Sequence, residues 1–435
     1  MKMLFNYSGF LPYIVVVFLN AFVDLGHKII IQNTIFKIYD GQEQIILTAI
    51  VNALILIPFV LLVSPVGFCS DKLPKNKVML ISAWAAIGIT LCITLFYYLG
   101  WFWPAFVMTF VLALQSAFYS PAKYGYIKEM VGNNNLARAN GLVQATTTVA
   151  ILSSIFVFSI FFEVFLIGTK YNDTSSLLIN IAPIGWSLVV LSIIELGLAY
   201  KLPQKYAVDA EMKFEVKKYI SGQYLKSNMR AVLGHETIFL SIIGLAIFWA
   251  ISQVILAIFP TYVKETLSIT NTIIIQGILA CSGMGIMLGS IIAGRLSKTR
   301  IETGLIPVGS IGITFCLLIL PALSNVYLQA ILFFGWGIFG GFILIPLNSL
   351  IQFHAEKNEL GRILASSNLI QNTVMLIFLG LTMLFALYGI NSLTLFHILS
   401  VVAILGTFYT VYKLPQSFAQ FIANHVIVNV FRPKI

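Results

Sequence analysis

Twelve long apolar stretches, separated by short polar segments, constrain this chain more than any other feature of its sequence. A helix needs roughly 20 mostly apolar residues to cross the hydrocarbon core of a bilayer. Strands of a membrane barrel would be about ten residues long with alternating polarity, and the stretches here are longer and do not alternate. Because lipid satisfies no backbone polar group, we expect an all-α membrane protein. The predicted spans are residues 11–36, 45–68, 78–99, 104–126, 139–168, 177–202, 238–262, 273–296, 305–323, 327–353, 363–388 and 393–412.

The composition agrees with a surface that faces lipid. Of the 435 residues, 59% are hydrophobic and only 10% are charged, whereas a soluble domain carries roughly 25% charged residues. The net charge of +10 would suit a nucleic-acid partner, but the basic residues lie almost entirely between the apolar stretches, so we expect none. The 4 cysteines have neither CxxC nor Cys/His spacing, which argues against a disulfide framework or a zinc site. We expect neither a metal nor another cofactor.

The distribution of lysine and arginine predicts the orientation of the spans. With a cytoplasmic N-terminus, 22 of the 26 basic residues fall in cytoplasmic segments, and the exceptions are Lys28, Lys37, Lys170 and Lys264. Short cytoplasmic loops carry such an excess, so both termini are expected in the cytoplasm. One long basic connection follows the sixth span. It divides the chain into a six-helix bundle at 1–202, a cytoplasmic linker at 203–235, a second six-helix bundle at 236–414 and a cytoplasmic tail at 415–435.

Short motifs recur at equivalent places in the two halves. GFCSDKLPKNK from Gly67 follows the second span, and AGRLSK, which contains Arg295, follows the eighth. YSPAKYG with NGLVQ follows the fourth span, and IPLN with NLIQ follows the tenth. Transporter halves are often duplicated units, so the coincidence predicts two pseudo-symmetric bundles. Gly67, Asp71 and Lys72, with Arg295 in the repeat, form a predicted gating loop; an ordinary positively charged loop is the alternative.

Span one contains the strongest polar signal within the predicted membrane region. Asp24, His27 and Lys28 occupy positions i, i+3 and i+4 and therefore share one helix face. A charge near the bilayer centre costs roughly 2.5–3.5 kcal/mol on insertion scales, so such residues usually pair and face a cavity. We predict an Asp24–Lys28 pair that lines a cavity; a pair that only fixes helix packing is the alternative. For His27 we expect a packed histidine with one backbone partner.

Span four ends in a lysine between two aromatic residues. Tyr119 and Tyr124 flank Lys123 at the predicted cytoplasmic end. An ammonium group beside interfacial rings suits the phosphate of an anionic amphiphile. A snorkelling lysine that anchors the helix at the interface is the alternative.

Other polar residues within the spans are weaker signals, and most are expected to hydrogen-bond between helices. Glu195 lies near the cytoplasmic end of span six, where solvent access would explain it. Gln144 and Gln371 fall at equivalent places in the two repeats and would both face a central cavity. Gln253 and Asn348 are kept as further candidates for the substrate path.

Several of these runs resemble known transporters. The loop from Gly67 resembles the signature of the major facilitator superfamily between spans two and three, with Pro74 where the family usually has glycine. YSPAKYG followed by LARANGL, together with GGFILIPLNSLIQ from Gly340, closely resembles the bacterial lysophospholipid transporter family of that superfamily. The similarity extends across all twelve spans. AFVDLGHK in span one looks like the form found in transporters fused to acyltransferase and acyl-ligase domains.

The resemblance implies a function. A protein of this family flips lysophosphatidylethanolamine and related lysolipids to the inner leaflet of the bacterial inner membrane by alternating access. There an acyltransferase/acyl-carrier-protein synthetase partner re-acylates them. The family's acidic residue of span one falls on Asp24, and its lysine of span four falls on Lys123. The arginine of span seven is replaced at Leu256, so we expect Lys28 to supply that cation. We expect a monomer.

Three other functions stay open from the sequence alone. A protein of this fold could export drugs or other small solutes, because fold does not set cargo. A scaffold that recruits the acylating enzyme would use the basic linker at 203–235. An integral-membrane enzyme would need a catalytic pair, and the 5 histidines are too dispersed, so we do not expect an enzyme.

Overall fold

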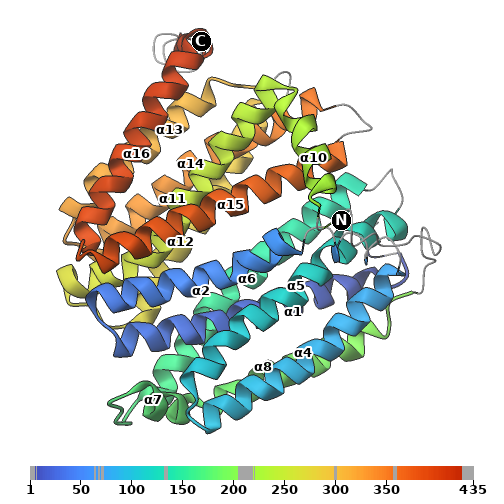
Figure 1. Cartoon of the computed structure of the whole chain (residues 1–435), viewed down its shortest axis with the longest axis vertical. Coiled ribbons are helices and arrows are strands. Elements are labelled where there is room, and N and C mark those ends of the chain that lie inside the picture. The colour runs from blue at the N-terminus through green and yellow to red at the C-terminus, as the bar shows by residue number, and fades with distance from the viewer. Residues whose placement is uncertain are drawn as a thin grey trace, which may run out of the picture. The chain divides into compact units, whose positions relative to one another are not determined.

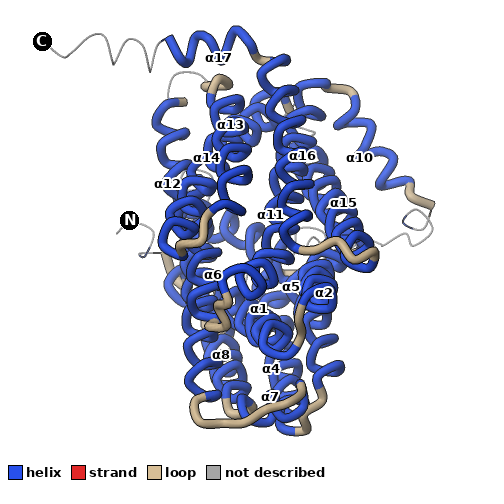
Figure 2. The backbone as a smooth tube through the Cα atoms, turned by 90° about the vertical axis from the view of Figure 1, so that its left-hand side faces the viewer, coloured by secondary structure: helices blue, strands red, loops and turns tan. Residues whose placement is uncertain are grey.

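The computed structural model describes residues 5, 7–62, 65–66, 69, 73–131, 136–203, 219, 221–297, 301–355 and 360–423. Within these ranges the chain consists of helices and loops, without a strand (Figure 2). The first helices are α1 (Phe10–Ile38), α2 (Gly41–Leu61), α4 (Lys75–Tyr98), α5 (Phe102–Val131), α6 (Leu136–Leu166), α7 (Thr174–Ile181) and α8 (Ile184–Ala199) (Figure 1). The later ones are α10 (Gln223–Leu233), α11 (Glu236–Leu267), α12 (Thr272–Leu296), α13 (Leu305–Ile319), α14 (Val326–His354), α15 (Leu360–Leu387), α16 (Ser392–Lys413) and α17 (Pro415–Phe421).

The described helices confirm the predicted fold class. Eleven of them are long and apolar enough to cross a membrane, or twelve if α7 and α8 form one span. The predicted sixth span at 177–202 corresponds to two helices, α7 and α8, which meet at an angle of 52°. The bend falls at Pro183, the N-cap residue that directly precedes α8. Proline has no N–H to continue the hydrogen-bond ladder, and its ring clashes with the preceding turn.

The chain divides into two compact units. The N-terminal unit comprises Met1–Tyr39, Ile50–Tyr224 and Asn271–Ile273, and the C-terminal unit comprises Asp40–Ala49, Leu225–Thr270 and Ile274–Ile435. In the N-terminal unit α1 packs on α5, α6 and α8, and α4 packs on α5 and α8. In the C-terminal unit α11 packs on α14, α15 and α16, and α13 packs on α14 and α16. The second pattern repeats the first with each span replaced by the one six places later.

Two short helices lie in segments that the sequence analysis left without structure. α10 occupies part of the predicted linker, and α17 begins the predicted tail. In α10 the buried Val232 and the half-buried Met229 recur at helical spacing, while Lys226 and Arg230 are exposed. This spacing of apolar and charged residues gives α10 one face for packing and one for water.

Glycines let α12 and α14 approach closely in the C-terminal unit. Gly285 and Gly289 on α12 form one GxxxG pair, and Gly337 and Gly341 on α14 form another. A Cβ atom added to Gly337 would lie 2.0 Å from the carbonyl oxygen of Ser282, and one added to Gly285 would lie 2.0 Å from that of Phe334. Small residues at such spacing bring membrane helices into backbone contact and allow van der Waals packing in place of a hydrophobic driving force.

We predict that Gly337→Ala lowers the thermal unfolding temperature of the purified protein in detergent. The added methyl group meets backbone atoms that cannot rotate away, and overpacking of this kind costs about 1–3 kcal/mol. Gly335→Ala is the matched control, because a Cβ atom at this position on the same helix meets nothing within 4 Å. Equal unfolding temperatures for the two variants would contradict the proposed role of the close contact.

Candidate functional site

A polar group lies between α1 and α5 in the N-terminal unit. The half-buried carboxylate of Asp24 on α1 accepts a hydrogen bond from the Ser116 hydroxyl on α5. Lys123, two turns further along α5, is close enough for its ammonium group to interact electrostatically with that carboxylate. Ser116, Tyr119 and Lys123 are spaced at i, i+3 and i+7, so they share the face of α5 that meets α1. Tertiary packing therefore joins Asp24 to Lys123, the two residues carried over from the family.

The backbone around Lys123 is fixed by a tyrosine on α1. Tyr13 is fully buried, and its hydroxyl donates a hydrogen bond of 2.8 Å to the carbonyl oxygen of Lys123. Its ring also packs on that of Tyr126, whose hydroxyl donates to the carbonyl oxygen of Pro203 at 2.7 Å. These contacts hold the end of α5 against α1. They fix the backbone position from which the Lys123 side chain extends toward Asp24.

Glu195 on α8 is the functional candidate that the sequence analysis missed. It was interpreted as solvent-accessible, but its exposed fraction is 0%. Neither of its carboxyl oxygens has a hydrogen bond of normal geometry among the described residues, although the Asn20 amide lies close enough to interact with them. Tyr119 Oη also has no hydrogen-bond partner among these residues. Electrostatic interactions link Glu195 to Asp24 and Tyr119. The correction arises because α8 packs on both α1 and α4, which removes water from this face of the helix.

Unsatisfied polar atoms at this depth are informative. A buried donor or acceptor without a partner costs about 1–3 kcal/mol, and native proteins retain few of them. Here Tyr119 and Glu195, which carry such atoms, interact electrostatically with the Asp24 carboxylate, and Asn20 interacts with Glu195. Other residues of the same unit also carry unsatisfied atoms, namely Asn52, Asn76, Thr109 and Glu129. The arrangement leaves hydrogen-bonding capacity for a ligand or for water beside a carboxylate and an ammonium group.

The predicted Asp24–Lys28 ion pair does not form in the described part of the chain. Asp24 bonds to Ser116 instead, and Lys28 has no hydrogen-bond or ion-pair partner among the described side chains. Both residues are half-buried, as is Gln32 one turn further, and Gln32 donates a hydrogen bond of 3.2 Å to Asn52 on α2. Because 24, 28 and 32 are spaced by four residues, they form one polar stripe along α1. The charges share a face, as predicted, without pairing.

His27 is a structural residue that joins three helices. Its imidazole is fully buried, with Nδ1 at 2.8 Å from Tyr97 Oη on α4 and Nε2 at 3.0 Å from the carbonyl oxygen of Ala105 on α5. A carbonyl can only accept, so Nε2 carries a proton and the Tyr97 hydroxyl donates to Nδ1 of the neutral ring. The expected packed histidine with a backbone partner is confirmed.

Among the remaining predicted site residues, no hydrogen bond or ion pair joins those that the structure describes. In the C-terminal unit Asn348 is exposed and donates to the carbonyl oxygen of Leu344, Gln371 donates to the Ser367 hydroxyl, and Arg295 is exposed in the last turn of α12. Gln253 is half-buried, and its Oε1 has no partner among the described residues. Five others lie outside the described residues or side chains: Gly67, Asp71, Lys72, Tyr124 and Gln144.

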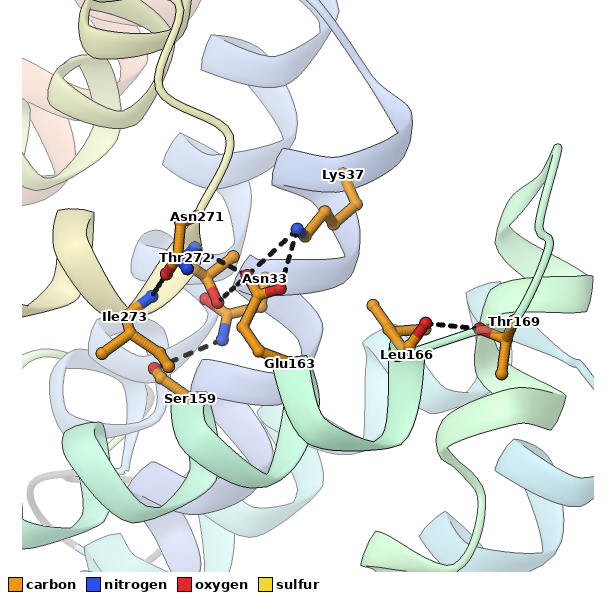
Figure 3. A network of polar contacts seen from close by, with 9 residues as sticks. All are labelled: Asn33, Lys37, Ser159, Glu163, Leu166, Thr169, Asn271, Thr272 and Ile273. Atoms are coloured by element: carbon orange, nitrogen blue, oxygen red, sulfur yellow. Dashed lines mark hydrogen bonds and ion pairs between the residues drawn. The ribbon is translucent and has the colours of Figure 1, made fainter.

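A second polar network lies at the other end of α1 (Figure 3). The ammonium group of Lys37 pairs with the Glu163 carboxylate on α6 at 3.0 Å. The same carboxylate accepts hydrogen bonds from the backbone N–H and the hydroxyl of Thr272, at 2.7 and 2.8 Å. One turn inward, Asn33 donates to the Ser159 hydroxyl at 3.3 Å. Glu163 is therefore the centre of a network that ties α1 to α6, whereas Asp24 has one described hydrogen bond, from Ser116.

Comparisons with known proteins agree with this architecture. The model of the Major Facilitator Superfamily matches residues 13–379. The chain is 26% identical over 349 residues to the lysophospholipid transporter LplT of Photorhabdus laumondii, covering 79% of this chain and 81% of the relative. It is 27% identical over 404 residues to the lysophospholipid transporter LplT of Salmonella heidelberg, covering 88% and 90%. The crystal structure of a D-xylose-proton symporter superposes with a TM-score of 0.66 at 15% identity, covering 93% and 97%.

The fold and the buried charged group define a polytopic membrane transporter. The chain belongs to the Major Facilitator Superfamily, whose model covers most of its length. The resemblance to lysophospholipid transporters that the sequence motifs indicated is confirmed by the curated relatives. The solved structure is too distant in sequence to show more than the shared fold.

We predict that Glu195→Met raises the thermal unfolding temperature of the purified protein while it lowers transport. Replacing a buried carboxyl that lacks a partner by an apolar side chain of similar length removes a desolvation cost of about 1–3 kcal/mol. Glu129→Met is the matched control, because Glu129 pairs with the buried Lys75 at 2.8 Å. That substitution leaves a buried charge unpaired and lowers the unfolding temperature. A fall in unfolding temperature for Glu195→Met would contradict our account of this residue.

Proposed function

We propose that this chain transports lysophosphatidylethanolamine and related lysophospholipids across the bacterial inner membrane. The observation that carries the proposal is the group formed by Asp24, Ser116 and Lys123. It places a carboxylate and an ammonium group on packed helices whose other buried side chains are mostly apolar. A lysophospholipid needs charged partners for its zwitterionic head group and apolar side chains for its single acyl chain. The names of the curated relatives support the same class of substrate.

The head group would be bound through its two charges. Its ammonium group suits Asp24, which is half-buried and whose carboxylate uses one described hydrogen bond. Its phosphate suits Lys123 and Lys28, which flank Asp24 from α5 and α1. Lys28 needs no rearrangement to bind, because it has no partner among the described side chains. In this arrangement the substrate, rather than Asp24, is the partner of Lys28.

Movement across the bilayer would follow alternating access, in which two repeated bundles rock about a site near the bilayer midplane. The lysine and arginine bias supports cytoplasmic termini. The lysolipid would be delivered to the inner leaflet, where an acyltransferase/acyl-carrier-protein synthetase partner would re-acylate it. The chain itself would act by transport and not by catalysis.

Reconstitution tests the proposed activity directly. Proteoliposomes that contain only this protein are expected to move fluorescent lysophosphatidylethanolamine between leaflets faster than protein-free liposomes, as measured by leaflet-selective quenching. Diacyl phosphatidylethanolamine should compete weakly, because its second chain needs additional apolar wall. Failure to move lysolipid under any imposed ion gradient would overturn the proposal. Movement of a soluble solute in the same vesicles would then favour the small-solute exporter.

We predict that Asp24→Asn and Lys123→Gln each reduce the initial rate of lysolipid flipping by at least about tenfold, equivalent to about 1.4 kcal/mol of lost interaction. Asparagine retains an acceptor for Ser116, so the loss would report the charge and not the hydrogen bond. Lys28→Gln should raise the lysolipid concentration needed for half-maximal flipping. Lys170→Gln is the matched control, because Lys170 is an exposed loop residue. Normal flipping by both Asp24→Asn and Lys123→Gln would contradict the assigned site.

A further inference from the structure

The C-terminal unit contains a cavity that the proposed site does not use. It has a volume of about 640 Å³ and is lined by residues of α11, α13, α14 and α16. This volume lies within the range of about 300–1,000 Å³ that is typical of small-molecule sites. All of its lining residues belong to the C-terminal unit, whereas Asp24, Lys123 and Glu195 belong to the N-terminal unit.

The wall of the cavity is apolar over a length that suits an acyl chain. Its lining on α11 runs from Glu236 to Ile251, which corresponds to about 22 Å at the helical rise of 1.5 Å per residue. One leaflet of the hydrocarbon core is about 15 Å thick, so the lining is long enough to follow a lipid chain along its length. The apolar wall residues include Ile243, Ile247, Ile306, Ile313, Leu347 and Val402.

Three hydroxyl groups in the lining are already bonded within their own helices. Ser241 donates to the carbonyl oxygen of Thr237 in its own helix at 2.7 Å, and Ser310 donates to that of Ile306 at 2.9 Å. Thr410 donates to the carbonyl oxygen of Thr407 at 2.9 Å. A hydroxyl that is already bonded to its own backbone offers no free donor to a ligand. Below its mouth the cavity therefore favours hydrocarbon over a polar solute.

The mouth of the cavity has one charge of each sign. Glu236 in the first turn of α11 and Lys413 in the last turn of α16 lie with Oε1 and Nζ 3.5 Å apart, and their side chains are 78% and 43% exposed. An exposed pair of this kind contributes only about 0.2–1 kcal/mol, so it opens easily. A carboxylate beside an ammonium group complements the two charges of a zwitterionic head group. The carboxylate disfavours a head group whose net charge is negative.

We infer that this cavity binds a zwitterionic lysophospholipid, with its single acyl chain between α11, α13, α14 and α16 and its head group between Glu236 and Lys413. The lipid ammonium group would lie at Glu236 and the phosphate at Lys413. The inference rests on the proposed function only for the substrate class. It adds a second lipid site, in the unit that does not contain Asp24.

Photo-crosslinking of the full chain tests the inference. The probe is lysophosphatidylethanolamine with a diazirine near the end of its acyl chain, and the labelled peptides are mapped by mass spectrometry after irradiation in proteoliposomes. We expect labels on α11 and α13 near Ile247 and Ile313. Lysophosphatidylglycerol should compete at least about tenfold less well than lysophosphatidylethanolamine, and Glu236→Gln should reduce that preference. Labels confined to other helices would overturn the inference.

A pair of glycine variants supplies the matched control. Gly406 lines the cavity, Gly380 on α15 does not, and a Cβ atom at either position meets nothing within 4 Å. Gly406→Leu should reduce labelling in the cavity by about tenfold, and Gly380→Leu should leave it unchanged. Val402→Phe fills the cavity one turn away and replaces Gly406→Leu if that variant does not fold. Undiminished labelling in the folded cavity-filling variant would overturn the inference.

Flipping measured on the same wild-type vesicles separates the two proposals. Flipping without labels in the cavity would overturn the second site and leave the proposed function intact. Labels in the cavity without flipping would support the second site and overturn the proposed function.

Discussion

The structure depends on one constraint: a polar group placed in hydrocarbon must find its partner inside the protein. Hydroxyl side chains satisfy it locally, as Thr90, Ser192 and Ser400 do by donating to carbonyl oxygens four residues earlier in their own helices. Charged groups satisfy it between helices, as Lys37 and Glu163 do. Most buried polar atoms in the described helices follow this rule. Several buried atoms do not, and those of Tyr119 and Glu195 lie beside the charged pair of Asp24 and Lys123, which is where we propose that a ligand binds.

The two units repeat their helix packing but not their chemistry. α1 and α11 each pack on the three equivalent neighbours in their units. In the N-terminal unit these helices enclose Asp24, Lys123 and Glu195, whereas in the C-terminal unit they surround an apolar cavity with charges at its mouth. Duplication fixes backbone positions, while side chains diverge freely wherever packing volume is kept.

Much of the candidate site was accessible from the sequence because charges are rare in apolar stretches. Asp24, Lys28 and Lys123 were recognisable because a charge within a membrane span costs free energy, and Asp24 and Lys123 also because of the family resemblance. Their partners were not, because Ser116 and Tyr13 are ordinary residues whose role depends on which helix face meets α1. Glu195 was misjudged for a related reason. Its place near the predicted cytoplasmic end of span six indicated solvent access, but burial is set by the neighbours α1 and α4.

By itself, the sequence determined the class of solvent, the approximate places of the spans and the superfamily. These properties follow from hydrophobic length, charge placement and repeated motifs, which act locally along the chain. Tertiary structure decided the bend at Pro183, the burial of Glu195 and the cavity of the C-terminal unit. It also decided that Asp24 bonds to Ser116 and does not pair with Lys28. Each of these depends on which side chains from distant helices fill the same space, and no local pattern specifies that.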